Sequence, residues 1–275
     1  MISIIIINFN TFDLTCRCIE SVVENTKGIE YEIILVDNAS TECKPEFFTK
    51  RFQGITLVTS PVNLGFAGGN NLGIEQSKGD YILLLNSDTI FTENCLGFLS
   101  RKFETLKRPG FVGIKTFYPD GSLQFTCERL PSLKNQVYRF FFITRFFKLQ
   151  RNYSILDRDF SPEAIWGSFL FFKKDLLFHL PGKKLDELFF MYHEDLLWCW
   201  QARKAGFKNY FVSGTSFIHV FKGSQLNDTV KTKMDDLFNA NFARLEKIIN
   251  GSIGYPVYSF VQRIIRSRAH LAKAE

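Results

Sequence analysis

Several common signals are missing from this sequence of 275 residues. The six cysteines contain no C-x-x-C pair, so a zinc site is not expected. No apolar run reaches the roughly 18 residues that a membrane-spanning helix needs. Residues 1–8 lack the charged segment that opens a signal peptide, and their β-branched run is typical of a buried strand. These absences favour a cytoplasmic protein with free thiols.

Two common nucleotide-binding motifs are absent as well. The glycine-rich segment 63–71 reads N-L-G-F-A-G-G-N-N, which is not the G-x-G-x-x-G motif of dinucleotide-binding folds. It also lacks the Lys-Ser or Lys-Thr that ends a P-loop. The sequence therefore supports neither a dinucleotide-binding fold nor a P-loop kinase, although these glycines would let the backbone approach a ligand closely.

Charge and aromatic content restrict the partners only in part. The formal net charge is +6, which favours anionic partners such as nucleotides, phospholipids or nucleic acid. No recognised nucleic-acid-binding motif accompanies this charge, so no nucleic-acid partner is expected. Phenylalanine is unusually common, with 31 residues, and most of it is expected to pack in the core.

Apolar runs alternate with helical patterns through the first third of the chain. Strands are expected at 2–7, 31–36, 55–59 and 81–85, and helices at 70–77 and 95–106. A further helix is expected after the first strand, where Leu14, Cys18, Val22 and Val23 recur at helical spacing. This alternation predicts a mostly parallel sheet covered by helices, in which ligands bind at the carboxyl ends of the strands.

The rest of the chain is less regular. Its expected elements are a turn at Pro119-Asp120-Gly121, a strand at 164–172, a helix at 194–205 and a strand at 207–212. The C-terminus, from about residue 229 to 274, is helical in pattern with a break between Gly251 and Pro256. We therefore expect a main domain over residues 1–222 and a C-terminal helical extension over 223–275.

Polar residues follow each of the first four strands. They are Asn8 and Asn10, then Asp37 to Ser40, then the segment 61–71, and finally Asn86, Ser87 and Asp88. One such loop would mean little. Four in series predict a polar rim along one edge of the sheet, which suits a polar ligand.

Two aspartates on this rim each allow two interpretations. Asp88 follows the most apolar strand, and its carboxylate could bind a divalent cation such as Mg²⁺, which prefers oxygen ligands. Asp37 could accept a hydrogen bond from a ribose hydroxyl or a base N–H. The alternative for Asp88 is a cap of the following helix or turn, and the alternative for Asp37 is a helix cap.

Three residues further along the chain are also candidates. Asp195 begins an apolar helix, whose dipole would hold its carboxylate anionic, as a general base requires. The alternative for Asp195 and Glu194 is a cap of the same helix, and for Glu194 it is the better interpretation. His219 follows an apolar strand and could complete a metal site begun by Asp88, although a structural role is the more common one for a single histidine.

Together these segments resemble glycosyltransferase family 2, the inverting enzymes of the GT-A fold. The likeness is strongest to the rhamnosyltransferase-like branch that builds bacterial surface polysaccharides. It covers about residues 1–222 and rests on six blocks in a fixed order: residues 4–10, 36–40, 63–73, 84–88, 166–168 and 186–195. Cys199, Gly206 and His219 follow these blocks. The resemblance implies an α/β protein with a mostly parallel central sheet flanked by helices.

The resemblance also implies roles for individual residues. Asp195 corresponds to the catalytic base, and Asp88 and His219 correspond to ligands of Mg²⁺ or Mn²⁺. The donor-binding group comprises Asn8, Asn10, Asp37, Asn63, Gly68, Asn70, Asn86, Ser87, Trp166 and Glu194. In this group Asn86 stands where many relatives have the first aspartate of an Asp-any-Asp motif. A second difference is Leu197, which replaces an aspartate that relatives often have on the helix after Asp195.

The function that follows is transfer of a hexosyl or deoxyhexosyl group from a nucleoside diphosphate sugar to an acceptor hydroxyl, with inversion. The acceptor would be a glycan or a lipid-linked glycan in the synthesis of bacterial surface polysaccharide. The alternative is a non-catalytic protein that binds a nucleotide sugar or serves as a scaffold in a polysaccharide assembly complex.

Two basic segments rich in apolar residues allow two interpretations of what the protein contacts in the cell. In the first, Arg139, Arg145, Lys148 and Arg151 are interleaved with phenylalanines, and in the second Val257, Val261, Ile264 and Ile265 share a helical face flanked by Arg263, Arg266, Arg268 and Lys273. Such helices lie on anionic membranes, which would place the protein at the inner face of the cell membrane. They also pack on a core or a partner subunit with their charges in solvent.

Overall fold

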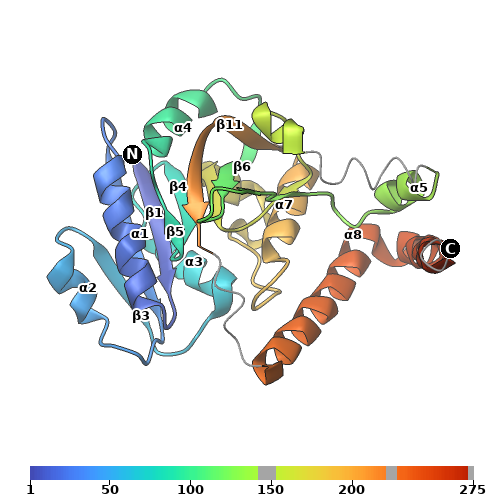
Figure 1. Cartoon of the computed structure of the whole chain (residues 1–275), viewed down its shortest axis with the longest axis horizontal. Coiled ribbons are helices and arrows are strands. Elements are labelled where there is room, and N and C mark those ends of the chain that lie inside the picture. Colours follow the sequence, from blue (N-terminus) through green and yellow to red (C-terminus); the bar gives the residue numbers. More distant parts are fainter. Residues whose placement is uncertain (142–152, 221–227, 272–275) are drawn as a thin grey trace.

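The computed structural model describes residues 1–141, 153–220 and 228–271 (Figure 1). Its first half alternates strands with helices, as the sequence predicts. The strands are β1 (Ile2–Asn8), β2 (Tyr31–Asn38), β3 (Thr56–Ser60) and β4 (Tyr81–Asn86). The helices between them are α1 (Phe12–Asn25), α2 (Glu46–Arg51) and α3 (Gly65–Gln76). These strands pair in parallel in the order β3-β2-β1-β4.

The second half of the chain extends the same sheet. Its strands are β5 (Thr89–Ile90), β6 (Pro109–Phe117), β7 (Leu123–Gln124), β10 (Phe169–Lys173) and β11 (Lys208–His219). The order continues as β4-β10-β6-β11-β5, with β10 antiparallel to β4 and β11 parallel to β6. A separate ribbon joins β8 (Cys127–Glu128) to β9 (Ala164–Ile165). The prediction of a mostly parallel sheet is confirmed.

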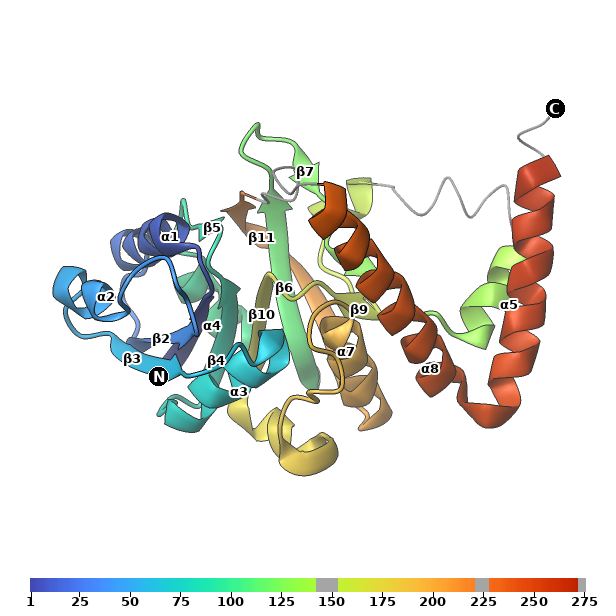
Figure 2. The same cartoon turned by 90° about the horizontal axis from the view of Figure 1, so that it is seen from below.

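Helices cover both faces of this sheet. Ile4 and Ile6 of β1 belong to the core that includes α1 and α4 (Cys95–Phe103). Ile5 belongs to the core on the other face, which includes α3 and α7 (Glu194–Lys204); Figure 2 looks onto these two helices. All three isoleucines are fully buried. Burial on both faces explains why the strands are continuous apolar runs.

The helix expected at 70–77 begins earlier than predicted, at Gly65. Glycines lower helix propensity, so the sequence suggested a loop through 63–69. Close packing overrides this preference, since a Cβ on Gly73 would lie 2.5 Å from Cγ2 of Ile5. Gly65 itself has φ of +72°, and a Cβ there would lie 2.2 Å from the carbonyl oxygen of Phe190. The glycines thus let α3 approach the sheet and the loop before α7.

The strand expected at 164–172 is split into β9 and β10 by a bend at Trp166-Gly167-Ser168. The bend was not predicted because the segment is mostly apolar, and at the bend the Gly167 amide donates a hydrogen bond to Asp195 on α7. The helix predicted at 194–205 is confirmed as α7, and the following strand extends to His219 rather than ending at 212. Val23 of the expected apolar stripe in α1 is 51% exposed.

The predicted C-terminal helix is confirmed as α8 (Asp228–Leu271), with its break at Gly251, where φ is 65° and ψ is 179°. Figures 1 and 2 show that α8 leans away from the sheet and turns at this break. Its second half packs against α5 (Leu133–Phe141). Short helical turns, η1 (Tyr153–Asp157), η2 (Lys174–His179) and η3 (Pro181–Lys183), complete the described elements.

A buried polar network joins α5 to both halves of α8. The Tyr258 hydroxyl donates to Glu246 at 2.7 Å and accepts from Nε2 of Gln136 at 3.0 Å. Oδ1 of Asn250 accepts from the Leu133 amide at 2.6 Å.

None of the helices within the described ranges is both long enough and apolar enough to cross a membrane. The predicted basic residues Arg145, Lys148, Arg151 and Lys273 lie outside the described residues, and the side chains of Arg266 and Arg268 are not described.

Candidate active site

The predicted polar rim forms where β1, β2, β3 and β4 end. Asn8 is fully buried there, and its Nδ2 donates to Oδ1 of Asp37 and to Oγ of Ser40, both at 2.8 Å. Its Oδ1 accepts from the hydroxyls of Thr11 and Thr15. Because both hydrogens and both lone pairs of this amide are engaged, Asn8 orients Asp37 and offers no polar atom of its own to a ligand.

Asp37 and Asn10 fix the loop that follows β2. Oδ2 of Asp37 accepts from the Ser40 amide at 3.2 Å, and the residue is 3% exposed. No helix begins here, since α2 starts at Glu46, so the helix-cap interpretation of Asp37 is wrong. Asn10, with φ of 53°, accepts from the Thr41 amide at 2.8 Å and so holds the same loop to β1.

The glycine-rich segment is held by Asn38, which the sequence analysis had not singled out. Its Oδ1 accepts from the Leu64 amide at 2.9 Å, and its Nδ2 donates to Oδ1 of Asn63 at 3.0 Å. Asn63 in turn accepts from the Gly65 amide at 2.9 Å. Asn70 is buried and donates to the Phe66 carbonyl, and a Cβ on Gly68 would lie 2.8 Å from Leu64. The side-chain amides of Asn63 and Asn70 therefore stabilise the start of α3.

Asp88 and His219 lie together, as predicted, although they are far apart in the sequence. The short strand β5 pairs with the end of β11, which brings Nε2 of His219 to 3.2 Å from Oδ1 of Asp88. Ser87 joins this pair to the rim, since its hydroxyl is 3.1 Å from that of Thr11. Asp88 lies in the turn between β4 and β5 rather than before a helix, so its interpretation as a helix cap is wrong.

This pair can supply two ligands to a divalent cation. Two ligands at ~2.1 Å from one ion and at right angles lie ~3.0 Å apart, close to the observed separation. Nδ1 of His219 is 2.9 Å from Oε1 of Gln124, an atom that can only accept a hydrogen bond, so the ring proton lies on Nδ1 and the Nε2 lone pair faces Asp88. No group of three or more acidic, histidine or cysteine side chains within the described residues could hold a metal. The remaining ligands would therefore come from substrate phosphate and water, as is usual for Mg²⁺.

Asp195 is the second residue of α7 and contacts the bend between β9 and β10. Its Oδ2 accepts from the Gly167 amide at 2.7 Å, and its Oδ1 accepts from the Leu196 amide at 2.8 Å. Burial raises the pKa of this carboxyl, and these two hydrogen bonds only partly oppose that rise. The expectation that the helix holds Asp195 anionic is therefore too simple, because loss of hydration outweighs the N–H groups around it.

Glu194 is buried beside Asp195 and does not cap the helix. The residue before the helix is His193, which has φ of 70° and no capping hydrogen bond from its side chain. Oε2 of Glu194 is buried without a hydrogen-bond partner among the described residues. Burial and the neighbouring Asp195 raise the pKa of Glu194. An unpaired, buried acid of this kind indicates a position where a polar ligand can be bound.

Trp166 and Glu128 form the other side of the bend. The Trp166 Nε1 donates to Oε1 of Glu128 at 2.8 Å, and the Trp166 amide donates to the Thr126 carbonyl. Burial raises the pKa of Glu128, and this carboxylate raises that of Asp195 in turn. Nothing in the sequence marked Glu128, which reaches the site only through the pairing of β8 with β9.

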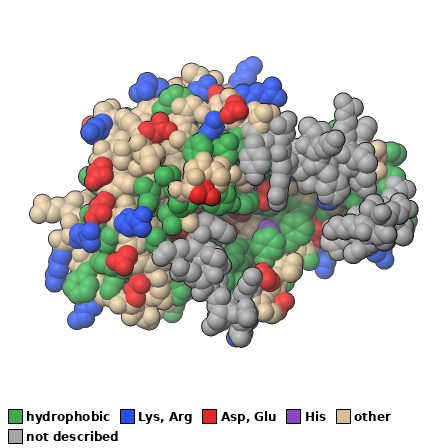
Figure 3. Space-filling model, viewed as in Figure 1, with side chains coloured by type: hydrophobic (Ala, Val, Ile, Leu, Met, Phe, Trp, Pro, Cys, Tyr) green, Lys and Arg blue, Asp and Glu red, His purple; other side chains and the backbone are tan. Residues whose placement is uncertain are grey.

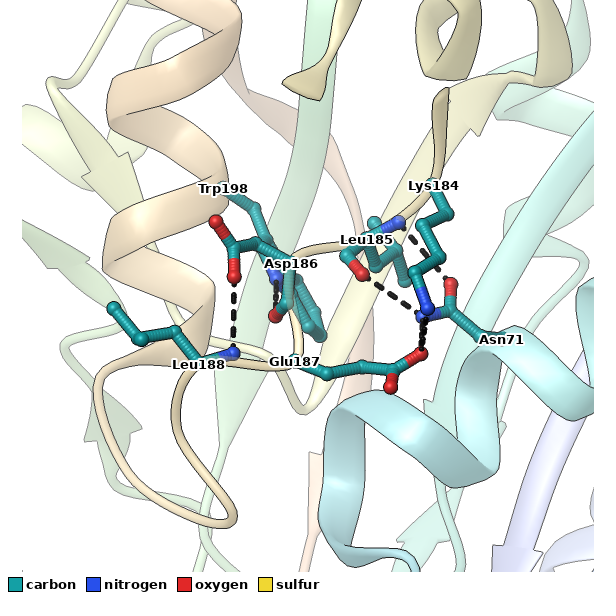
Figure 4. Close-up of polar contacts among 7 residues, drawn as sticks. All are labelled: Asn71, Lys184, Leu185, Asp186, Glu187, Leu188 and Trp198. Atoms are coloured by element: carbon teal, nitrogen blue, oxygen red, sulfur yellow. Dashed lines mark hydrogen bonds and ion pairs between the residues drawn. The ribbon is translucent and has the colours of Figure 1, made fainter. Parts of the chain in front are cut away.

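The loop before α7 is anchored to α3 (Figure 4). Asn71 pairs with the backbone of Leu185, accepting from its amide at 3.1 Å and donating to its carbonyl at 2.8 Å. Glu187 accepts from both Asn71 and Lys184. The Asp186 carbonyl accepts from Nε1 of Trp198 on α7 at 2.9 Å. These contacts fix the start of α7, and with it Asp195, relative to the rim.

Helix α8 supports the same loop from outside. The His193 ring lies 4.2 Å from that of Phe238 and 5.1 Å from that of Phe242, centroid to centroid. Nδ2 of Asn241 donates to the Met191 carbonyl at 2.8 Å. Burial lowers the pKa of His193 to about 4, so its ring is neutral at physiological pH. In Figure 3, hydrophobic side chains line a hollow near the middle of this face of the molecule.

Contacts thus connect the predicted site residues into one region. Asp37 connects through Asn8 and Thr11 to Ser87 and Asp88. Asp195 connects through Gly167 to Ser168, whose carbonyl accepts from the Asn86 amide at 3.1 Å. A hollow of about 430 Å³ at the amino ends of β2 and β3, lined by residues such as Tyr31 and Arg51, contains none of these residues.

The sheet and its rim define the GT-A fold. The crystal structure of S. aureus TarS 1–349 in complex with UDP-GlcNAc matches with a TM-score of 0.60 and 15% identity, over 94% of this chain and 70% of that chain. The crystal structure of GalNAc-T7 with UDP, GalNAc and Mn²⁺ matches with a TM-score of 0.61 and 15% identity, over 80% of this chain and 44% of that chain. At these identities the likeness establishes the fold alone.

Residues 3–174 match the family model described as Glycosyl transferase family 2, and the chain belongs to this family. It is 24% identical over 203 residues to the N-acetylglucosaminyl-diphospho-decaprenol L-rhamnosyltransferase of Mycobacterium tuberculosis, covering 68% of this chain and 66% of that protein. It is 37% identical over 92 residues to the poly(ribitol-phosphate) beta-glucosyltransferase of Bacillus spizizenii, covering 32% of this chain and 14% of that protein. Two further curated relatives are covered over 24% and 38% of their length. The predicted family and fold are confirmed.

Proposed function

We propose that the protein transfers a sugar from a nucleoside diphosphate sugar to an acceptor hydroxyl, with inversion at the anomeric carbon. The observation that supports this most strongly is the meeting of two acidic centres at one edge of the sheet. Asp88 lies 3.2 Å from His219 at the end of β4, and Asp195 reaches the same edge through Gly167 and Ser168. A donor bound across this edge would have its diphosphate at the first centre and its sugar near the second.

The donor would bind along the rim, with Asp37 near its base or ribose. Asn8, Asn10, Asn63, Gly68 and Asn70 would act mainly by shaping that rim, since their described contacts are within the protein. Asp88 and His219 would hold Mg²⁺ or Mn²⁺, which offsets the negative charge that develops on the leaving diphosphate. Asn86 and Ser87 directly precede Asp88 in the chain and would therefore lie beside the proposed metal.

Asp195 would act as the general base. Its carboxylate would accept the proton of the acceptor hydroxyl while that oxygen attacks the anomeric carbon and the bond to the diphosphate breaks. Attack from the face opposite the leaving group inverts the configuration. Glu194, whose pKa is raised, would keep its proton and donate a hydrogen bond to a donor sugar hydroxyl.

The relatives support a role in cell-surface polysaccharide synthesis. By their names, one transfers rhamnose to a lipid diphosphate sugar, and the other transfers glucose to poly(ribitol-phosphate). We propose a hexosyl or deoxyhexosyl donor and a glycan or lipid-linked acceptor for this chain. The chain covers less than two thirds of the length of several of these relatives, so their names support substrate classes for it rather than particular substrates.

We also propose that residues 1–222 carry the catalytic domain and that 223–275 form a helical extension at the inner face of the cell membrane. Three hydrophobic side chains on α5 and α8 support this placement: Phe141 is 70% exposed, Ile253 is 89% exposed and Phe260 is 58% exposed. Exposed apolar groups on basic helices favour an anionic membrane surface.

A screen of nucleoside diphosphate sugars by thermal shift, with and without Mn²⁺, tests the donor. Bound donor raises the melting temperature because it binds only the folded chain. NMR of the transfer product then reports the anomeric configuration, which inversion makes opposite to that of the donor. Donor binding without any transfer across a panel of acceptors would favour the non-catalytic alternative.

A further inference from the structure

Three acidic side chains lie near the start of α7 without a cation paired to them. Glu194 is buried, whereas Asp195 and Glu128 are partly buried. None of the three makes an ion pair within the described ranges. Acids in a poorly hydrated region with no counter-charge repel one another, so the protonation of each depends on the charge of its neighbours. The proposed function uses Asp195 and Glu194 and leaves Glu128 without a role.

We propose that Glu128 is a positioning residue of the transfer reaction, which keeps a negative charge near Asp195 and so makes that carboxylate a stronger proton acceptor. The proposal rests on the proposed function, in which Asp195 is the base. Glu128 acts through Asp195 and takes no proton from the acceptor itself.

The structure fixes Glu128 beside the bend between β9 and β10. Trp166 directly follows β9, and the pairing of β8 with β9 brings Oε1 of Glu128 to 2.8 Å from the indole Nε1, which donates to it. The Trp166 amide donates to the Thr126 carbonyl at 2.9 Å, so the tryptophan is held by both its side chain and its backbone. The next amide, that of Gly167, donates to Oδ2 of Asp195 at 2.7 Å. Glu128 and Asp195 therefore bind consecutive residues of one constrained segment.

Glu128 is the charged neighbour of Asp195. Burial raises the pKa of Asp195, and the charge of Glu128 raises this pKa further. The other ionisable groups near this carboxyl are Glu194 and Cys199 on α7 itself, and burial raises the pKa of both. Each of them keeps its proton at the pH where Asp195 loses its own, so neither supplies a charge there. The bend, residues 166–168, contains no ionisable side chain.

This arrangement suits a general base. A carboxylate with the ordinary aspartate pKa of about 3.9 is ionised at neutral pH but attracts a proton weakly. A nearby negative charge disfavours the ionised form and therefore strengthens the attraction for a proton. The indole N–H of Trp166 stabilises the charged form of Glu128, which keeps that charge in place.

Nuclear magnetic resonance of the full chain measures this coupling without any substrate. The Gly167 amide donates to Asp195, so its chemical shift follows the ionisation of that carboxyl. Residues 166–167 are the only Trp-Gly pair in the sequence, so carbon-13 at the tryptophan carbonyl and nitrogen-15 in glycine select one amide signal. The variants are Glu128→Gln, which keeps an acceptor for the indole but removes the charge, and Glu128→Asp, which keeps the charge. The control is Glu163→Gln, which removes an acid beside β9 that does not act on Asp195.

We expect the Gly167 signal to titrate in wild type and not in Asp195→Asn. Its midpoint should fall by about half a pH unit or more in Glu128→Gln, and stay in place in Glu163→Gln. Glu128→Asp should remain closer to wild type. The indole N–H of Trp166 reports Glu128 in the same way, and its midpoint should fall by a similar amount in Asp195→Asn, because coupling between two sites is reciprocal. This second measurement decides the matter if Glu128→Gln does not fold.

Transfer assays then test the role of the coupling in the reaction. The acid side of the kcat profile should move to lower pH together with the Gly167 midpoint, and KM for the donor should be unchanged. Equal midpoints in wild type and Glu128→Gln, an equal fall in Glu163→Gln, or an unmoved kcat profile overturns the inference. The proposed function survives that result if Asp195→Asn still abolishes transfer. A shifted midpoint in a wild-type chain that transfers no sugar instead removes the proposed function, and the role of Glu128 in the reaction with it.

Discussion

The Gly167 amide donates a 2.7 Å hydrogen bond to Oδ2 of Asp195, which joins the bend between β9 and β10 to the first turn of α7. The bend also holds Trp166 against Glu128 and places the Ser168 carbonyl on the Asn86 amide. One short segment therefore connects the candidate base, Glu128 and the end of the strand that precedes Asp88. A base held by two backbone N–H groups keeps its orientation while its pKa is set by burial.

Glu194 should destabilise the fold increasingly as pH rises. Burial raises its pKa, so the folded chain keeps this proton at pH values where the unfolded chain has released it. Stability therefore falls as pH rises above the ordinary glutamate pKa of about 4.3. We expect Glu194→Gln to melt at a higher temperature than wild type at pH 8, with a gap that closes toward pH ~4. Thermal melts across this range check it, with exposed Glu75→Gln as the control; a gap independent of pH would contradict it.

His193 should destabilise the fold at acidic pH. Burial lowers its pKa to about 4, whereas an unfolded histidine titrates near 6.5, so the unfolded chain binds an extra proton between these values. We expect a loss of unfolding free energy on the order of 3 kcal/mol from pH 7 to pH 4. His193→Asn keeps a residue that tolerates positive φ and should remove this part of the loss. Urea unfolding at both values, with exposed His179→Asn as the control, measures it. An unchanged pH dependence in His193→Asn would rule out this role.

Asp88 and His219 should couple donor binding to a divalent cation. In wild type we expect a nucleoside diphosphate sugar to raise the melting temperature more with Mn²⁺ than with EDTA. Asp88→Ala should abolish the difference, and His219→Gln should reduce it without lowering the melting temperature of the ligand-free chain greatly. Asp120→Ala, on an exposed turn, is the control. A Mn²⁺ effect that persists in Asp88→Ala would exclude the pair as the metal site.

The exposed hydrophobic residues on α8 should determine membrane binding. Ile253→Ser with Phe260→Ser removes two side chains that are 89% and 58% exposed, so the fold should be unaffected. We expect wild type to float with anionic vesicles and the double variant to remain in the dense fraction. Phe47→Ser with Val62→Ser removes exposed apolar groups elsewhere and should float like wild type. Equal flotation of both double variants would show that α8 is not the contact.

The sheet and its rim could be predicted from the sequence because both depend on local patterns. Strands such as Ile2–Asn8 are continuous apolar runs, and the polar residue at each strand end follows directly in the chain. The sequence offered the pairing of Asp88 with His219 as one possibility and the family resemblance favoured it, but the pairing itself depends on β5 meeting the end of β11. The resemblance also identified Asp195, for which a helix start alone allowed a capping role.

The remaining contacts are tertiary and left no mark in the sequence. Gln124 and Glu128 reach the site through strand pairing between distant segments, whereas Asn38 lay on the predicted rim but had no predicted role. Gly167 lay within a recognised block, but its role as a donor depends on the bend that Asp195 stabilises. The pKa shifts of Glu194 and Asp195 follow from burial, which a sequence pattern does not measure.

Transfer by purified Asp195→Asn tests the central claim most directly. The substitution keeps the size of the side chain and an acceptor for one N–H group but cannot take a proton. We expect turnover to fall by about 10²- to 10⁴-fold, while the donor still raises the melting temperature as in wild type and the exposed control Asp175→Asn stays fully active. Turnover within twofold of wild type in Asp195→Asn would contradict the assignment of Asp195 as the base, and with it the proposed mechanism.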